Sequence, residues 1–496
     1  MAGKLIPHWI DGKASERAPE RTGDVFNPAT GEVQAKVAFA TPAIVDEVVE
    51  SAWKASQTWR HTSIAKRTKI MFAFRQLVDK HATELASILT REHGKVTGDA
   101  NGEVQRGLEV IEFACGIADL AKGEFSENVS TEVDTYSIRQ PLGVVAGITP
   151  FNFPAMVPMW MFPIAIACGN TFVLKPSERD PSAANFMAQL LADAGLPPGV
   201  FSVVHGDKVA VDRLLEHPKI AAVSFVGSTP IAQYIYETGT KHGKRVQALG
   251  GAKNHMIVLP DADMELAADA AVSAGYGSAG ERCMAISMLV GVGNAADKLV
   301  PLLKERIAKL KVGNGTDPKS EMGPLVTKQH LDKVRGYVDA GVSEGATLLA
   351  DGRDLKIDNG FFLGPCLFDN VKPSMSIYKD EIFGPVLSIT RVASYDEAIN
   401  LVNKNPYANG VAIFTNDGGA ARKFQHDVEV GMVGINVPIP VPMAYYSFGG
   451  WKASLFGDLH IYGPDGVQFY TRTKAVTSRW PDPSHRGVDL GFPQNK

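Results

Sequence analysis

The stretch from Gly143 to Gly239 most strongly limits the folds open to this chain, because short apolar runs alternate there with helix-like segments. The apolar runs cover 143–148, 171–174, 200–204 and 221–226, and the helix-like segments cover 156–167, 183–194 and 231–239. Strands that are apolar along their whole length are typical of a parallel sheet with helices on both faces. The stretch therefore predicts an α/β fold.

A second series of strands and helices, from His255 to about Phe448, predicts a second α/β unit. Its expected elements are a strand around residue 289, a helix over 302–310, and strands around residues 386 and 411. Turns rich in glycine and proline separate these elements and support the division into short units.

The two ends of the chain have other patterns. Residues 45–59, 64–91 and 102–121 carry apolar side chains at three- and four-residue spacing, which is typical of amphipathic helices. Residues 131–139 and the tail 467–480 alternate polar and apolar side chains, which predicts strands. Because the tail is too isolated to form its own core, we expect it to pair with another element or another subunit.

Charge and cysteine content exclude several classes of protein. The net charge of −4 does not suit a nucleic-acid-binding face, and no apolar run approaches the roughly 20 residues of a membrane helix. Residues 1–8 have neither a signal-peptide nor a transit-peptide pattern. The four cysteines form no CxxC pair, which indicates a reducing compartment and no structural zinc. We expect a cytoplasmic protein that binds no nucleic acid, no membrane and no metal.

Cys283 is the main candidate for a reactive residue. It follows the small-residue stretch 277–280 and precedes the apolar run 286–290, so it lies where a loop enters a strand. A cation beside it, at Arg282, lowers the pKa of a thiol, and the thiolate is the nucleophilic form. The alternative is a small buried hydrophobic residue, which is the usual state of a free cysteine.

Two motifs follow strands of the first series, at the sheet edge where open α/β proteins bind ligands. Lys175 and Glu178 could hold ribose hydroxyls, and a carboxylate there favours NAD over NADP; the alternative is a solvated turn. Gly227 and Ser228 close a strand and open a helix, which suits a pyrophosphate. The alternative for Ser228 is an ordinary helix N-cap.

Asn152 lies in a stiff stretch between two aromatic residues and two prolines, over 150–154. A fixed amide donor is what a developing oxyanion needs. The alternative is an asparagine that only closes a turn. The stretch follows the strand 143–148, so it belongs to the same edge of the predicted sheet.

Five motifs in one order resemble the aldehyde dehydrogenase superfamily over nearly the whole chain. They are PFNFP at 150–154, LKPSE at 174–178, FVGST at 225–229, GERC at 280–283 and EIFGPV at 381–386. The resemblance implies an aldehyde dehydrogenase-like α/β fold with two parallel-sheet domains and a small β arm for oligomerisation. It implies a Rossmann-like NAD-binding domain over 1–122 and 140–251, a catalytic domain over 252–450, an arm over 123–139 and 467–486, and a homodimer or a homotetramer built as a dimer of dimers.

The same resemblance implies roles for single residues. Cys283 is the expected nucleophile, and Asn152 with the Cys283 backbone N–H is the expected oxyanion hole. Lys175 and Glu178 are expected on the adenosine ribose, Glu381 on the nicotinamide ribose, and Phe383 near the nicotinamide. The full expected set of NAD-binding residues is Thr149, Phe151, Lys175, Glu178, Gly227, Ser228, Glu381 and Phe383.

One departure from the family pattern bears on the reaction. The family usually has a glutamate that activates the water which hydrolyses the thioester, and alignment on Lys253 and Asn254 puts Leu249 there. Leucine cannot take a proton, so a thiol such as coenzyme A (CoA), a better nucleophile than water, is the expected acyl acceptor. A second departure is Ala232, where another glycine is common in the phosphate-side helix.

The segments GAKNH at 251–255, RCMA at 282–285 and FGGWKASLFGD at 448–458 resemble the branch of CoA-acylating methylmalonate-semialdehyde dehydrogenases. This resemblance implies that Arg106 and Arg282 hold the substrate carboxylate, because a guanidinium can bond it bidentately. The alternative for Arg106 is a charge on a helix surface.

The expected reaction is NAD-dependent oxidation of methylmalonate or malonate semialdehyde through a Cys283 thioester. Loss of CO2 and acyl transfer to CoA then give propionyl-CoA or acetyl-CoA. One alternative is a hydrolytic NAD-dependent aldehyde dehydrogenase that releases a free acid. Another is a non-catalytic relative on the same fold.

Overall fold

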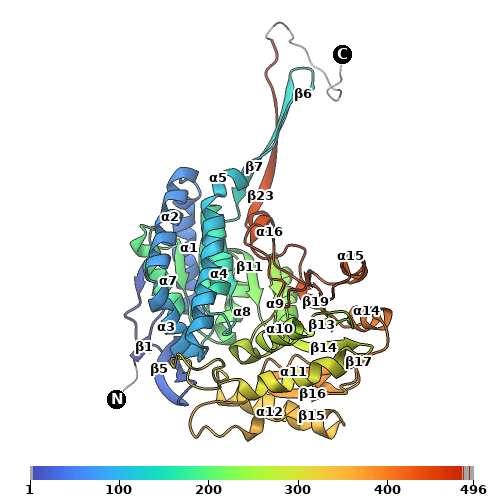
Figure 1. Ribbon diagram of the computed structural model, residues 1–496. Coiled ribbons are helices and arrows are strands. Elements are labelled where there is room, and N and C mark those ends of the chain that lie inside the picture. Colours follow the sequence, from blue (N-terminus) through green and yellow to red (C-terminus); the bar gives the residue numbers. More distant parts are fainter. Residues whose placement is uncertain (1–3, 483, 485–490, 492–496) are drawn as a thin grey trace.

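Two sheets form the body of the protein in a computed structural model that describes residues 4–482, 484 and 491 (Figure 1). The first sheet consists, in spatial order, of β22 (Leu455–Phe456), β12 (Arg245–Leu249), β11 (Ile220–Val226), β8 (Val144–Ile148), β9 (Thr171–Lys175), β10 (Phe201–Val203), β2 (Trp9–Ile10) and β3 (Lys13–Ala14). The strands from β12 to β10 are parallel. The predicted parallel sheet is therefore confirmed, with short antiparallel strands added at both edges.

The second sheet is formed by the second predicted series. Its strands, in spatial order, are β15 (Thr347–Ala350), β16 (Cys366–Asp369), β17 (Val386–Val392), β14 (Ile286–Val292), β13 (Asn254–Val258), β19 (Gly410–Phe414) and β20 (Met432–Ile435). All neighbours are parallel except β15 and β16. The predicted domain junction at residue 251 falls between β12 and β13, which belong to different sheets; the division into two domains stays a prediction.

Helices cover both faces of the first sheet. One face packs on α2 (Ile64–Lys80), α4 (Thr97–Cys115), α6 (Met156–Ala167) and α7 (Ser182–Asp193), and the other on α1 (Pro42–Trp59), α8 (Lys208–Glu216) and α9 (Thr229–Lys241). Every residue of α6 is buried, which explains why its sequence is apolar on all sides. The predicted helix over 64–91 is two helices, because the chain breaks at His81 before α3 (Ala82–His93).

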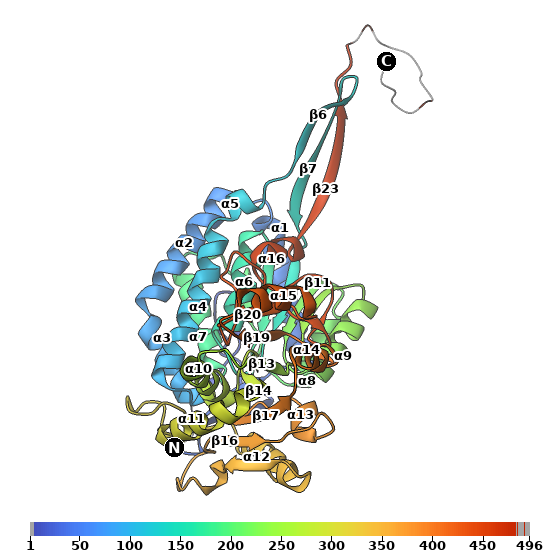
Figure 2. The same cartoon turned by 45° about the vertical axis from the view of Figure 1, so that its right-hand side comes forward.

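Helices also cover both faces of the second sheet (Figure 2). One face packs on α10 (Met264–Tyr276), α11 (Ala295–Lys309) and α12 (Lys328–Ser343), and the other on α14 (Tyr395–Asn403) and α15 (Gly418–Asp427). A separate three-stranded sheet near the N-terminus contains β1 (Lys4–Ile6), β5 (Glu32–Phe39) and β4 (Arg21–Asn27). No helix in the described part of the chain has the length and apolar character needed to cross a bilayer.

A β ribbon projects from the body, and both views show it clear of the two sheets (Figures 1 and 2). It consists of β6 (Phe125–Ser130), β7 (Val133–Pro141) and β23 (Thr471–Arg479), so the tail pairs with an element of its own chain. The predicted tail strand was placed too early, because Val467 belongs to α16 (Gly463–Phe469) and is buried in the body. Of the predicted arm over 467–486, residues 483, 485 and 486 lie outside the described residues.

Candidate active site

Two cavities meet at Cys283. A cleft of about 880 Å³ runs along the carboxyl ends of β8, β9, β11 and β12, where parallel sheets bind ligands. A second cavity of about 440 Å³ lies between α4, α6 and the turn before β14. Cys283 lines both cavities, so a reactive thiol there can reach a molecule in either one.

The cleft collects most of the residues predicted to bind NAD. Those that line it are Thr149, Phe151, Glu178, Gly227, Ser228, Glu381 and Phe383. The eighth, Lys175, is buried, and its Nζ donates to Glu178 Oε2 over 3.1 Å. Although burial raises the pKa of Glu178, the Lys175 ammonium and further hydrogen bonds hold that pKa below its usual value. The two residues thus form a paired, partly buried site, not a solvated turn.

The predicted pyrophosphate seat has an open hydroxyl. Ser228 stands at the N-cap position of α9, but its side chain makes no capping hydrogen bond to that helix. Its exposed hydroxyl and the N-terminal end of α9 both face the cleft. This geometry suits an anion, because a helix N-terminus presents unpaired N–H groups and a partial positive charge. The ordinary N-cap interpretation of Ser228 is not what the structure shows.

Glu381 and Phe383 close the cleft on the side of the second sheet. Glu381 Oε1 accepts a hydrogen bond from the Ala252 N–H at 2.9 Å, and burial raises the pKa of its carboxyl to about 7. Phe383 has a left-handed backbone with φ of 60°, and its ring meets Phe151 edge-on at 5.8 Å. A non-glycine residue in that region is uncommon and marks a backbone held by its surroundings.

The thiol of Cys283 is harder to ionise than the sequence suggested. Burial raises its pKa to about 12, and the nearby Glu381 carboxylate acts in the same direction. Arg282 does lower this pKa, as expected, but more weakly than these two effects. Its Nη2 donates to Asp99 Oδ1 on α4 over 2.7 Å. The backbone N–H groups of Cys283 and Met284 favour the thiolate.

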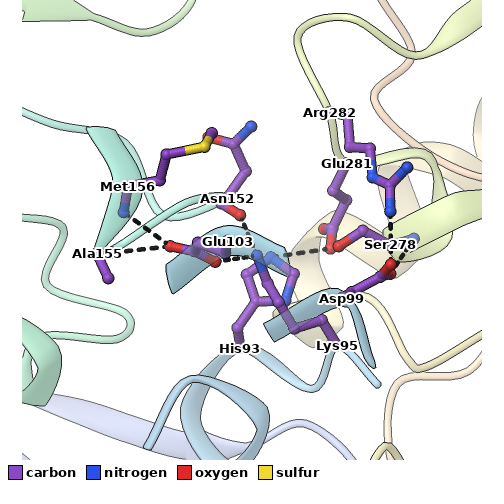
Figure 3. Close-up of polar contacts among 10 residues, drawn as sticks. All are labelled: His93, Lys95, Asp99, Glu103, Asn152, Ala155, Met156, Ser278, Glu281 and Arg282. Carbon is purple, nitrogen blue, oxygen red and sulfur yellow. Dashed lines mark hydrogen bonds and ion pairs between the residues drawn. The ribbon is translucent and has the colours of Figure 1, made fainter. Parts of the chain in front are cut away.

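The turn before Cys283 has a strained backbone. Ser278, Ala279 and Gly280 are three consecutive residues in the left-handed region, with φ of 53°, 53° and 73°. Only glycine adopts that region without cost. Asp99 supports the turn, because its Oδ2 accepts from the Ser278 N–H at 2.9 Å while its Oδ1 binds Arg282 (Figure 3). No sequence motif pointed to Asp99.

Asn152 lies in the wall of the cleft, where its amide is proposed to donate to an oxyanion. Its backbone carbonyl accepts from Lys95 Nζ at 2.6 Å, whereas among the described residues no hydrogen bond is made by its side-chain amide. The side chain is buried yet lines the cleft. An amide that closed a turn would be bonded to nearby backbone, so the geometry favours a donor left free for a ligand.

The second cavity contains both arginines predicted to bind a carboxylate. Arg106 Nη1 donates to Glu109 at 2.7 Å, and its Nη2 donates to the backbone oxygens of Val441 and Pro442. Arg282 is 19% exposed and Arg106 is 31% exposed, the same as Arg353 in a surface ion pair. The place of Arg106 in the lining of the cavity, and not its burial, favours the carboxylate interpretation. The remaining walls are mainly apolar and include Phe153, Met156, Trp160, Ile439, Val441 and Phe448.

Leu249 occupies the position where the family's water-activating glutamate is expected. It ends β12, is 3% exposed, and packs in the same apolar core as Met284. An alkyl side chain in an apolar core neither accepts a proton nor orders a water. The sequence predicted that no base stands at this position, and the apolar surroundings of Leu249 agree with that prediction.

Glu281 is a buried carboxyl that the sequence motifs did not assign. His93 Nε2 lies 3.7 Å from one of its oxygens, and His330 Nε2 lies 3.5 Å from the other. Burial raises the pKa of Glu281 to about 8, and burial lowers the pKa of His330 to about 4 and that of His93 well below its usual value. The cluster is therefore uncharged near pH 7.

This cluster predicts a pH-dependent stability. Because the folded-state pKa of Glu281 is raised above its unfolded value of about 4.3, its stabilising contribution is complete below that value and is lost as the pH rises through about 8. Glu281→Gln removes this titration. The free energy of unfolding of the variant, relative to that of wild type, should therefore rise by roughly 1–3 kcal/mol between pH 6 and pH 9. Denaturant unfolding at both pH values measures this. Exposed Glu16→Gln is the control, and parallel profiles for Glu281→Gln and wild type would contradict the prediction.

Parallel sheets with a dinucleotide-sized cleft, and one cysteine between that cleft and a second cavity, define an α/β oxidoreductase. The model of the aldehyde dehydrogenase family matches residues 14–476, and this chain belongs to that family. The predicted fold class is thereby confirmed.

Several relatives are similar over nearly their full length. The chain is 56% identical to malonate-semialdehyde dehydrogenase of Pseudomonas aeruginosa, covering 95% of this chain and 96% of that protein. It is 51% identical to malonate-semialdehyde dehydrogenase 2 of Geobacillus kaustophilus, covering 96% and 99%. Methylmalonate-semialdehyde dehydrogenase of Oceanimonas doudoroffii has a crystal structure with a TM-score of 0.95 at 54% identity, covering 97% and 99%.

A further crystal structure, of a candidate methylmalonate-semialdehyde dehydrogenase from Sinorhizobium meliloti, was determined in complex with NAD. It has a TM-score of 0.96 at 55% identity and covers 97% of this chain and 99% of that one. A relative this similar that binds NAD supports NAD as the ligand of the cleft described above.

Proposed function

We propose that this protein is an NAD-dependent, CoA-acylating dehydrogenase of malonate semialdehyde and methylmalonate semialdehyde. The observation that carries the proposal is the cavity in which Arg106 and Arg282 lie beside Cys283, on the side opposite the dinucleotide-sized cleft. An aldehyde that also bears a carboxylate fits such a cavity, because guanidinium groups recognise carboxylates bidentately. The names of the similar proteins support the same substrates.

The residues of the cleft fit NAD. Lys175 and Glu178 would hold the adenosine ribose, Gly227 and Ser228 the pyrophosphate, and Glu381 the nicotinamide ribose, with the Phe151 and Phe383 rings beside them. NAD, when bound, supplies the acceptor for the hydride. The Glu178 carboxylate would repel a 2′-phosphate and so favours NAD over NADP.

The chain's own residues account for the acyl chemistry. The Cys283 thiolate attacks the aldehyde carbon, while the Asn152 amide and the Cys283 N–H donate to the developing oxyanion. Arg106 and Arg282 hold the substrate carboxylate. After oxidation, the carboxylate is β to the thioester carbonyl, so the electrons of the C–CO2 bond can move onto the thioester oxygen as CO2 leaves. The enolate then takes up one proton on carbon and becomes the acetyl or propionyl thioester. Leu249 gives water no base, which leaves the acyl group for CoA.

The arm supports a homodimer or a homotetramer. Several of its large apolar side chains are exposed, with Phe125 at 65%, Val129 at 49%, Ile138 at 37% and the following Trp480 at 87%. Exposed apolar surface on a projecting ribbon is typical of a contact with another chain. All four cysteines are free, which supports a reducing compartment such as the cytoplasm.

A single assay tests the proposed function. NADH formation from malonate semialdehyde is measured with and without CoA, and the thioester product is quantified. We expect a burst of NADH without CoA, because acylation precedes the slow step, and a higher steady rate with acetyl-CoA formed when CoA is present. Equal steady rates in both conditions, with free acid as the product, would support the hydrolytic alternative.

Arg106→Ala tests the substrate class. Loss of a charge-assisted bond worth about 1.5–3 kcal/mol should lower kcat/KM for malonate semialdehyde roughly ten- to a hundredfold and leave propanal much less affected. Arg106 is the better probe because Arg282 also neighbours Cys283 and supports its turn. Arg91→Ala, an exposed arginine in the last turn of α3, is the matched control. An equal loss for both substrates would refute the carboxylate assignment.

A further inference from the structure

The segment from the end of α3 to the start of α4 reaches both loops of the proposed active site. Four of its side chains point into that region: His93, Lys95, Asp99 and Glu103 (Figure 3). Asp99 supports the turn before Cys283, and His93 lies beside Glu281. Lys95 and Glu103 contact the loop that carries Asn152 instead.

Lys95 and Glu103 form an ion pair with no solvent exposure of either side chain. Lys95 Nζ donates to Glu103 Oε2 at 2.6 Å and to the backbone carbonyl of Asn152 at 2.6 Å. The same ammonium lies over the ring of Phe153, 4.3 Å from its centre. Asn152 is therefore held through its backbone carbonyl, and its side-chain amide stays free.

Glu103 holds the other end of the same loop. Its Oε1 accepts hydrogen bonds from the N–H groups of Ala155 and Met156, at 2.8 and 3.1 Å. These groups begin α6, and the N-cap residue Ala155 has no side chain that could cap the helix. A carboxylate at a helix N-terminus satisfies unpaired donors and the helix dipole. The loop is thus fixed at Asn152 and again three residues later.

A buried ion pair is a costly way to stabilise a fold. Two apolar residues of similar volume usually give equal or greater stability, because burying two charges costs about as much as their attraction returns. An oxyanion donor, in contrast, must lie about 2.7–3.1 Å from the atom it stabilises, and a displacement of about 1 Å can cost two orders of magnitude in rate. The need to place the Asn152 amide accurately therefore explains why the chain has a buried ion pair here.

We propose that Lys95 and Glu103 are positioning residues that hold the Asn152 amide in place for the oxyanion. This inference rests on the proposed function, in which Asn152 is that donor. Neither residue lines the dinucleotide cleft, and Glu103 borders the second cavity. The Glu103 side chain has no solvent exposure, and both of its oxygens are occupied by Lys95, Ala155 and Met156, so both residues act through the loop.

The double variant Lys95→Met, Glu103→Gln tests the inference. It removes both charges and keeps the volume, and the glutamine oxygen can still accept from Ala155 and Met156. We expect the NADH burst rate to fall roughly ten- to a hundredfold, with the KM for NAD within about twofold of wild type and the melting temperature little changed. A wild-type burst rate would show that the pair is only structural and would overturn the inference.

A double-mutant cycle with Asn152→Ala separates positioning from other effects. Once the donor is absent, loss of the pair should slow the burst by less than about threefold further, because residues that act as a unit are not additive. Full multiplication of the two losses would overturn the inference and leave the role of Asn152 intact. A normal burst rate in Asn152→Ala alone would overturn the oxyanion role and the inference together.

A second variant covers a failure of the double variant to fold. Lys95→Met alone keeps the Glu103 carboxylate and its two bonds to the N–H groups of Ala155 and Met156, and it removes the hold on the Asn152 carbonyl. We expect a burst rate roughly three- to tenfold below wild type at an unchanged KM for NAD. An unchanged burst rate in this variant would also overturn the inference.

Discussion

Cys283→Ala is expected to abolish NADH formation, with a loss of about 10⁴-fold or more, because no other group can form the thioester. Binding of NAD should remain close to wild type, since the residues proposed to hold it lie elsewhere in the cleft. Turnover and NAD binding by fluorescence titration measure the two effects. Cys115→Ala, a buried cysteine with a pKa that burial raises to about 11, is the control. Retained turnover in Cys283→Ala would falsify the mechanism.

The raised pKa of Cys283 adds a second measurement. Because burial raises the pKa of the thiol to about 12, the rate of alkylation of Cys283 in the free enzyme should still be rising at pH 10. A plateau below pH 8 would mean that a nearby charge, such as Arg282, dominates the thiol. That result would restore the expectation drawn from the sequence.

Asn152→Ala is expected to lower kcat by about 10²–10³-fold, the usual loss for one oxyanion donor. The KM values should change little, because the donor acts mainly on the charge that develops in the transition state. Steady-state and burst kinetics with malonate semialdehyde measure both quantities. Asn101→Ala, an exposed asparagine on α4, is the control. A change confined to KM would instead mark Asn152 as a residue that binds the ground state.

The sequence predicted the four central strands β8, β9, β10 and β11 because they are buried along all or nearly all of their length. The strands β12, β2, β3 and β22 were not predicted, and each of them is partly or fully exposed or only two residues long. The runs at 144–148 and 171–175 contain only residues that the structure buries, and such runs leave little choice of element. The tail was placed less accurately. Its alternation continues into Val467, yet that residue is in α16, because the buried body offers a better place for it than an exposed ribbon.

The candidate site was predicted where its residues are close in sequence or belong to motifs in a known order. Thr149, Phe151 and Glu178 follow neighbouring strands, so one sheet edge collects them. The residues that support the site from distant parts of the chain were not predictable in this way. Asp99 and Ser278 are 179 residues apart, and no local pattern couples them.

The sequence by itself determined the α/β class, the order of the motifs and the identity of the groups that can react, because these depend on side-chain chemistry and local periodicity. Only the tertiary structure decided the electrostatic state of those groups. Arg282 is adjacent to Cys283 in the chain, yet its guanidinium turns to Asp99 and burial sets the pKa of the thiol. Charge and burial depend on what surrounds a side chain in space, and for Cys283, Glu281 and Asn152 those neighbours come from distant segments.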